Sequence, residues 1–276
     1  MKRLFFAALA AASLAIAPRS ADAEVLIAPT RVVLEEGERS AQLVIVNKGE
    51  EEAAFRIGVE NRRMRLDGAL EAAENVREGE MFADDLIRYS PRRIVLEPGA
   101  RQTVRVSVRP GSDMPDGEYR SHLRLMAVPT SVGRSLEQAA ADTNSDELSI
   151  RLIAIRSLTI PIILRKGDLD AEAGLTGLEI RETESDDNES LLVARLTRTG
   201  SKSVYGDLLV YSGDQAQPMF QARGIAVYTP NAERDVILPI PEEIRDALSG
   251  TDVRVAYVSS DPTDSRVLAE FKTQLP

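Results

Sequence analysis

The chain has 276 residues, of which 43% are hydrophobic and 28% charged, and it contains no cysteine. This composition is typical of a globular protein with one large domain or two of common size, and it excludes disulfides, thiol catalysis and thiolate metal sites. The single histidine, His122, cannot build a zinc site of imidazoles, and the net charge of −10 argues against nucleic acid as the main partner.

The N-terminus has the layout of a secretory signal peptide, which we place at residues 1–23. Lys2 and Arg3 precede an apolar run, and Ala21-Asp22-Ala23 supplies small residues at alternate positions. The run, at residues 4–17, is shorter than the about 20 residues that cross a bilayer. No later run is long enough either. We therefore expect cleavage after Ala23 and no membrane insertion of the mature chain.

Short runs of alternating apolar and β-branched residues, separated by turn residues, predict strands through the rest of the chain. In chain order they lie at 40–46, 54–59, 102–108, 118–125, 148–164, 191–196, 207–211, 224–228, 235–240 and 252–258. Asp67-Gly68 between apolar residues favours a hairpin over a short helix at 69–76. Residues 241–249 predict one short helix. The spacing of the strands in two blocks indicates an all-β protein of two immunoglobulin-like sandwiches.

One predicted strand, at 148–164, is apolar on both faces. Residues 130–147 before it are rich in small and polar side chains and predict a long loop. Within the strand, one face carries Ile150, Leu152 and Ala154, and the opposite face carries Ile153 and Ile155. A strand that is apolar on both faces must be covered on both, and its own domain covers only one. The strand therefore predicts a partner that supplies the second cover.

The sequence offers little chemistry for an enzyme. The Gly-x-Ser-x-Gly motif, the phosphate loop and the dinucleotide glycine fingerprint are absent. His122 points to the side opposite Tyr119 and Leu123, which predicts an ordinary surface or rim histidine. The acidic turn at 185–189 lacks the spacing of a calcium-binding loop. We therefore expect no enzymatic activity, no cofactor and no metal.

Several segments follow the signal peptide in a fixed order: Pro29-Thr30-Arg31-Val32-Val33, then 38–47, 91–99, 102–105, 115–120 and the two-faced strand that ends at 164–165. In this order and spacing they resemble the PapD-like periplasmic chaperones of pilus assembly in Gram-negative bacteria. The resemblance is good across residues 24–165. It rests on size and strand pattern alone across residues 168–276.

The resemblance implies two immunoglobulin-like β-sandwich domains, at 24–165 and 168–276, set at an angle around a cleft. It implies a periplasmic protein that is not an enzyme. Such a protein caps pilin or fimbrial subunits by lending them a β-strand until an outer-membrane usher takes them. Backbone hydrogen bonds and alternate apolar side chains would join the two chains. Either face of the two-faced strand can supply these side chains, because a one-residue slip exchanges the faces.

The resemblance also implies roles for single residues. Arg31 matches the family's cleft arginine, which anchors the C-terminal carboxylate of the subunit through two hydrogen bonds. Pro161 stands where the family has a second anchor, a lysine; Arg156 or Arg165 is the alternative.

Three further residues match a buried ion network that joins the two domains in this family: Arg105, Glu118 and Asp261. A different class of function stays open, namely an exported structural or adhesive two-domain β-sandwich protein of the cell surface. Genes for an usher and for short pilin-like proteins beside this one would favour the chaperone.

Overall fold

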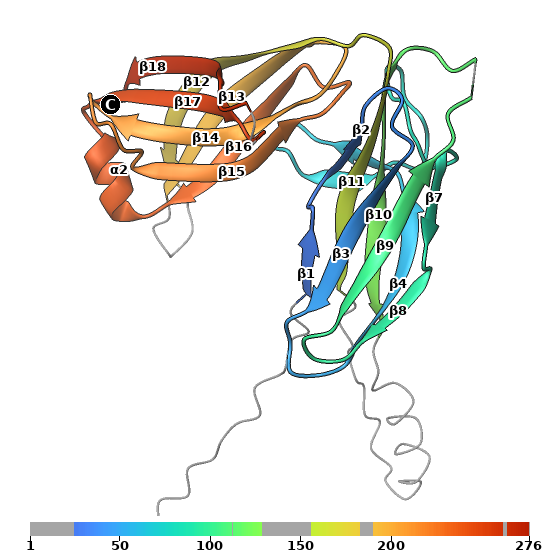
Figure 1. The fold of residues 1–276 in the computed structure, drawn as a ribbon. Coiled ribbons are helices and arrows are strands. Elements are labelled where there is room, and N and C mark those ends of the chain that lie inside the picture. Colours follow the sequence, from blue (N-terminus) through green and yellow to red (C-terminus); the bar gives the residue numbers. More distant parts are fainter. Residues whose placement is uncertain (1–24, 112, 129–155, 183–189, 262–263, 276) are drawn as a thin grey trace, which may run out of the picture.

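The structure is a computed structural model, and it describes residues 25–111, 113–128, 156–182, 190–261 and 264–275. Nearly all regular elements are strands, which form two β-sandwiches that meet at an angle (Figure 1). The predicted all-β fold class is thereby confirmed. Several predictions lie outside the described residues: the signal peptide, the loop at 130–147, the acidic turn at 185–189, and Ile150, Leu152, Ile153, Ala154 and Ile155.

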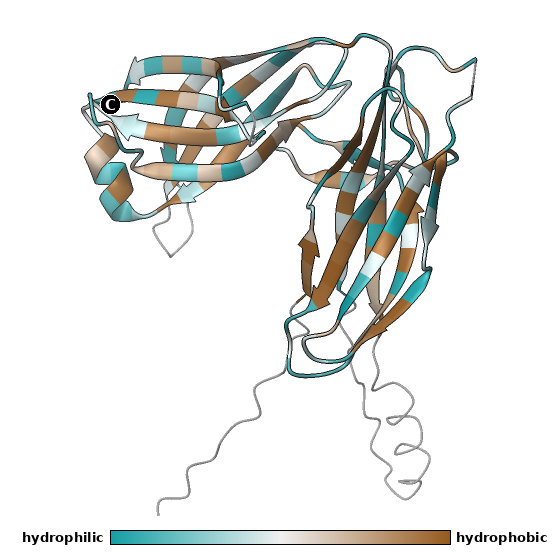
Figure 2. Ribbon diagram, viewed as in Figure 1, coloured by the Kyte–Doolittle hydropathy of each residue, from teal (hydrophilic) through white to brown (hydrophobic). Residues whose placement is uncertain are grey.

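The first sandwich consists of two sheets, with strand orders β1-β3-β9-β7 and β2-β11-β10-β4-β8. Its strands are β1 (Val25–Ala28), β2 (Val32–Leu34), β3 (Ser40–Asn47), β4 (Ala53–Glu60), β7 (Ile87–Ser90), β8 (Arg93–Leu96), β9 (Arg101–Val108), β10 (Gly117–Val128) and β11 (Ser157–Lys166). Alternate apolar residues such as Leu43, Val104 and Leu123 are fully buried between the sheets, as the period of two requires. Figure 2 shows this alternation along the strands.

The N-terminal segment changes sheets between β1 and β2. β1 pairs antiparallel with β3, whereas β2 pairs parallel with β11 through Val32↔Ile162 to Leu34↔Leu164. Residues 29–31 therefore cross from one sheet to the other, beside the second domain. This crossover determines where Arg31 lies.

A small hairpin projects from the first sandwich between the two domains (Figure 1). It consists of β5 (Arg62–Met64) and β6 (Leu70–Ala72), and Gly68 in its turn has a φ of 81°. This left-handed conformation favours glycine, so the hairpin predicted from Asp67-Gly68 is confirmed.

The second sandwich has sheets of order β12-β13-β16 and β15-β14-β17-β18. Its elements are β12 (Ala171–Glu182), β13 (Ser190–Gly200), β14 (Val204–Ser212), β15 (Phe220–Val227), β16 (Glu233–Ile240), β17 (Asp252–Ser259), β18 (Val267–Gln274) and the helix α2 (Glu242–Leu248). The helix confirms the prediction at 241–249. Among the described residues, no helix has the length and apolar character needed to cross a membrane.

Candidate functional site

An open cleft of about 770 Å³ lies between the two sandwiches. The first domain lines it with residues 27–31, which include the crossover between β1 and β2. The second domain lines it with Tyr205, Asp207, Arg223, Gly224 and Ser260. The cleft thus brings together side chains that are far apart in the sequence.

Arg31 is half-buried in this cleft, immediately before β2. The central carbon of its guanidinium group lies 3.5 Å from the centroid of the Tyr205 ring, a close cation–π contact. Burial lowers the pKa of Arg31, and the neighbouring Tyr205 acts in the opposite direction. No carboxylate within the described ranges forms an ion pair with Arg31. The cleft therefore presents a half-buried guanidinium group that has no ion-pair partner among the described residues.

One edge of β11 lies open next to the cleft. The carbonyl oxygen of Arg156 accepts a hydrogen bond from the Ala127 amide at 2.9 Å, so even-numbered residues of β11 bond to β10 and odd-numbered ones face away. On that other side, β2 covers only residues 162–164. No described strand covers residues 157–161. Leu158, opposite the buried Leu125, is 45% exposed, so no described residue closes the sandwich here.

Glu118 lies at the domain junction, and its side chain is completely buried. Its carboxylate accepts hydrogen bonds from Nε of Arg165 at 3.1 Å, from the amide of Ser203 at 3.0 Å and from the hydroxyl of Thr229 at 3.4 Å. The Ser203 hydroxyl donates a further, short bond. Because Ser203 and Thr229 belong to the second domain, this cluster ties the two domains together.

Of the other two residues matched to the interdomain network, Arg105 lies elsewhere. Arg105 is exposed on the outer face of β9, because its neighbours Val104 and Val106 face the core. Asp261 is exposed and forms an isolated β-bridge with Asp264. The cation that pairs with Glu118 is Arg165, which also contacts Glu35 at 2.8 Å. Among the described residues, Arg165 and not Arg105 is thus the cation that pairs with Glu118.

His122 is fully buried, so the prediction of a surface histidine was wrong. It shares one face of β10 with Arg120, whose guanidinium carbon lies 4.3 Å from the centroid of the Tyr228 ring. Among the described residues, neither ring nitrogen of His122 has a hydrogen-bond partner, and nor do Nε and one terminal nitrogen of Arg120. Burial, together with the nearby charges of Arg120 and Arg62, lowers the pKa of His122 to about 3. The apolar alternation along β10 predicted correctly that His122 lies on the face opposite Tyr119 and Leu123, but it does not show that other residues cover this face.

The hairpin and the second domain pack together beside Arg120, which is covered by Tyr228. Met64 of the hairpin packs in one apolar cluster with Ile163, Ala226 and Tyr228. Two hydrogen bonds also reach hairpin carbonyl oxygens, from the Asp235 amide to Leu66 at 2.7 Å and from the side-chain amide of Asn231 to Met64 at 3.0 Å. The hairpin therefore fills the angle between the domains.

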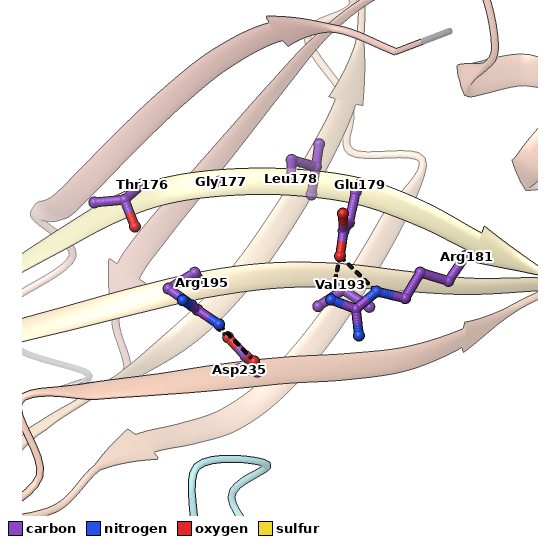
Figure 3. Close-up of a pocket in the computed structure, with 8 residues that line it drawn as sticks. All are labelled: Thr176, Gly177, Leu178, Glu179, Arg181, Val193, Arg195 and Asp235. Carbon is purple, nitrogen blue, oxygen red and sulfur yellow. Dashed lines mark hydrogen bonds and ion pairs between the residues drawn. The ribbon is translucent and has the colours of Figure 1, made fainter.

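A second hollow, of about 450 Å³, lies on the outer face of β12, β13 and β16 (Figure 3). Its charged side chains are paired with one another: Arg195 contacts Asp235 at 2.7 Å, and Arg181 contacts Glu179. It offers no unpaired charge to a ligand. Within the described ranges, no group of three or more Asp, Glu or His residues could hold a metal ion. The interdomain cleft is therefore the stronger candidate site.

The fold and cleft define a two-domain β-sandwich protein with an arginine-lined interdomain site. Neither a model of a known family nor a curated protein sequence matches the chain. Solved structures do match over most of its length. The periplasmic chaperone SfaE has 12% identity, a TM-score of 0.44, and coverage of 90% of this chain and 98% of its own.

Two complexes give similar values. The CsuC–CsuE complex of a chaperone with a tip adhesion subunit, from Acinetobacter baumannii, has 12% identity, coverage of 92% and 100%, and a TM-score of 0.45. The Salmonella enterica SafA pilin with the SafB chaperone has 17% identity, coverage of 93% and 99%, and a TM-score of 0.44. At these identities and scores, the likeness assigns no role to any residue.

Proposed function

We propose that this protein is a periplasmic chaperone of the PapD-like kind, which caps pilin or fimbrial subunits by lending them a β-strand before an usher takes them. One observation carries the proposal: the open edge of β11 ends at Arg31. In the parallel pairing, Val32 lies opposite Ile162, so Arg31 falls opposite Pro161, where β2 stops covering β11. A guest strand that pairs with residues 157–161 would lie on the same side of β11 as β2, in line with it.

The direction of such a guest strand follows from the position of Arg31. If the guest runs parallel to β11, as β2 does, its C-terminal end points toward residue 161. Its terminal carboxylate then meets Arg31, a half-buried cation without an anion. A guanidinium group binds a carboxylate through two charge-assisted hydrogen bonds. A guest strand can thus pair with β11 and at the same time place its C-terminal carboxylate at Arg31.

The lent side chains follow from the pleat of β11. Leu158, Ile160, Ile162 and Leu164 lie opposite Leu125, Leu123, Ser121 and Tyr119, on the face that packs into the core. Because alternate residues of a strand point to the same face, positions 150, 152 and 154 would share the face of Leu158 if the strand continued regularly. We therefore favour Ile150, Leu152 and Ala154 over Ile153 and Ile155 as the residues that enter the subunit.

The first experiment tests subunit capture. The tagged full chain is recovered from the periplasm of its own bacterium, and bound proteins are identified by mass spectrometry. We expect a small pilin-like β-sandwich subunit with the wild type. Arg31→Gln should recover at least about tenfold less of it, since a hydrogen bond to a charged group contributes about 1.5–3 kcal/mol. Its Tm should fall by only a few degrees, because the lost cation–π contact with Tyr205 contributes up to about 2 kcal/mol. Undiminished recovery by Arg31→Gln would contradict the anchor.

The second experiment tests the register. Leu152→Asp should abolish capture of the identified subunit, because it would place a charge in the apolar groove of the partner. Ile153→Asp, one position along, is the matched control and should retain capture. The opposite result would assign the lent side chains to Ile153 and Ile155. Capture by both variants would remove strand lending from the mechanism.

A further inference from the structure

A second arginine, Arg223, lines the same cleft as Arg31 but comes from the other domain. It is exposed, and its recorded partner is the side-chain oxygen of Gln221, 3.5 Å from a terminal nitrogen. No described carboxylate forms an ion pair with Arg223. Asp207 also lines the cleft, but its Oδ1 already accepts hydrogen bonds from the Gly224 amide at 3.0 Å and the Ser260 hydroxyl at 2.6 Å.

Arg223 is carried by a β-bulge in β15. The pairing of β14 with β15 shifts from Gly206↔Ile225 to Leu208↔Ala222, so Arg223 and Gly224 together lie opposite Asp207. Gly224 has a φ of 72°, the left-handed conformation of a bulge glycine. Bulges redirect side chains, and they are over-represented next to functional sites. Because Asp207 bonds to the Gly224 amide, it holds this bulge in place.

The bulge brings Arg223 close to the surroundings of Arg31. A Cβ atom at Gly224 would lie only 2.8 Å from the hydroxyl oxygen of Tyr205. Glycine therefore lets the bulge close against that tyrosine, whose ring supports Arg31. Arg31, Tyr205, Gly224 and Arg223 form a continuous wall of the cleft.

Other candidates for a second cation are already engaged or lie elsewhere. Arg165 contacts Glu118 and Glu35, and Pro161 carries no charge. Arg156 lies at the far end of the open edge, where its carbonyl oxygen bonds to Ala127. Two unpaired guanidinium groups in one cleft repel each other unless an anion lies between them.

We propose that Arg223 is the second cation that binds the C-terminal carboxylate of the guest subunit. This inference rests on the proposed function and deepens it. The carboxylate is then held by Arg31 of the first domain and Arg223 of the second. The site is complete only when the two domains keep their observed relation, so carboxylate binding couples the domains.

The test uses the full-length protein and two synthetic peptides that contain the last twenty or so residues of the captured subunit. One peptide has a free C-terminal carboxylate and the other a C-terminal amide. The Kd of each is measured by fluorescence anisotropy for the wild type, Arg31→Gln, Arg223→Gln and the control Arg105→Gln. Arg105 is exposed on the outer face of the first domain, away from the cleft. Its substitution makes the same change in charge.

We expect the wild type and Arg105→Gln to prefer the free acid by about tenfold or more, the value of a hydrogen bond to a charged group. Arg223→Gln should lose most of this preference and leave the affinity for the amide unchanged. A full preference in Arg223→Gln, with loss in Arg31→Gln, would overturn the role of Arg223 and leave the proposed function intact. Absence of any preference in the wild type would contradict the carboxylate anchor itself, and with it both proposals.

Discussion

Two positions on one face of β10 show opposite ways of burying a charged group at the domain junction. At Glu118, every partner is present: a guanidinium group, a backbone amide and two hydroxyl groups. Two residues on, Arg120 is 4% exposed, and two of its nitrogens have no hydrogen-bond partner in the part of the chain that the structure describes. The neighbouring His122 is completely buried, and the same described part offers no partner to either of its ring nitrogens.

The difference lies in what the second domain presents to each position. Opposite Glu118 it presents donors, from Ser203 and Thr229. Opposite Arg120 it presents the face of Tyr228, which attracts a cation but accepts no ordinary hydrogen bond. Burial of a charge is costly unless it is paired and hydrogen-bonded. The junction is therefore stabilised at Glu118 and carries a cost at Arg120 and His122.

The largest effect is expected from breaking the paired position. Arg165→Gln leaves the completely buried carboxylate of Glu118 without its cation. Removal of one partner of a buried pair costs about 3–5 kcal/mol of unfolding free energy, which urea denaturation measures. Arg105→Gln, the exposed control, should change it by less than about 0.5 kcal/mol. Equal effects of the two substitutions would contradict the comparison.

A smaller effect is expected from acid at the unpaired position. The pKa of His122 is about 3 in the folded protein, below its ordinary value of 6.5. As the pH falls below 6.5, the unfolded chain therefore binds a proton that the folded chain does not, and stability decreases. Between pH 6.5 and 5 this amounts to about 2 kcal/mol.

The matched variant for this prediction is His122→Leu, which cannot titrate. Urea denaturation at several pH values should show that this variant loses about 2 kcal/mol less than the wild type between pH 6.5 and 5. It should be as stable as the wild type or more so at pH 7, since it removes two unpaired buried nitrogens. Identical pH profiles would show that His122 is accessible to protons in the folded state.

The smallest effect is expected for Arg120→Leu. This substitution removes the cation–π contact with Tyr228, which contributes up to about 2 kcal/mol, and also removes the desolvation of an incompletely paired guanidinium group. The two changes oppose each other, so the unfolding free energy should change by less than about 1 kcal/mol. A loss as large as that of Arg165→Gln would mean that Arg120 is as well paired as Glu118.

Local sequence signals predicted much of the fold. The alternation at 102–108 and 118–125 matches β9 and β10, and Asp67-Gly68 marks the hairpin. β12 was missed because glycines and charged residues interrupt its pattern and a bulge lies between Leu175 and Gly177. Alternation requires regular pairing, so an irregular strand gives a weak signal.

The site was less predictable, because it forms between domains. Arg31 lines the cleft where its motif implied that it would lie, whereas Ser203 binds Glu118 through its backbone amide, a group that every residue except proline has. His122 was assigned to the surface because alternation identifies a face and not its cover. Nothing in the sequence singled out Arg223, since its direction depends on a bulge; the glycine at the first position of the strand predicted at 224–228 was the one usable signal.

Pro161 lies at the boundary between two parts of β11: residues 162–164, which pair with β2, and residues 157–160, whose outer edge no described strand covers. It is odd-numbered, so its nitrogen faces away from β10, toward the side that β2 covers only from Ile162 onward. A strand that pairs along the open edge would find no backbone N–H donor at Pro161. A guest strand bound as proposed would therefore be limited to the free part of β11, and the pairing of β2 with β11 would be protected from displacement.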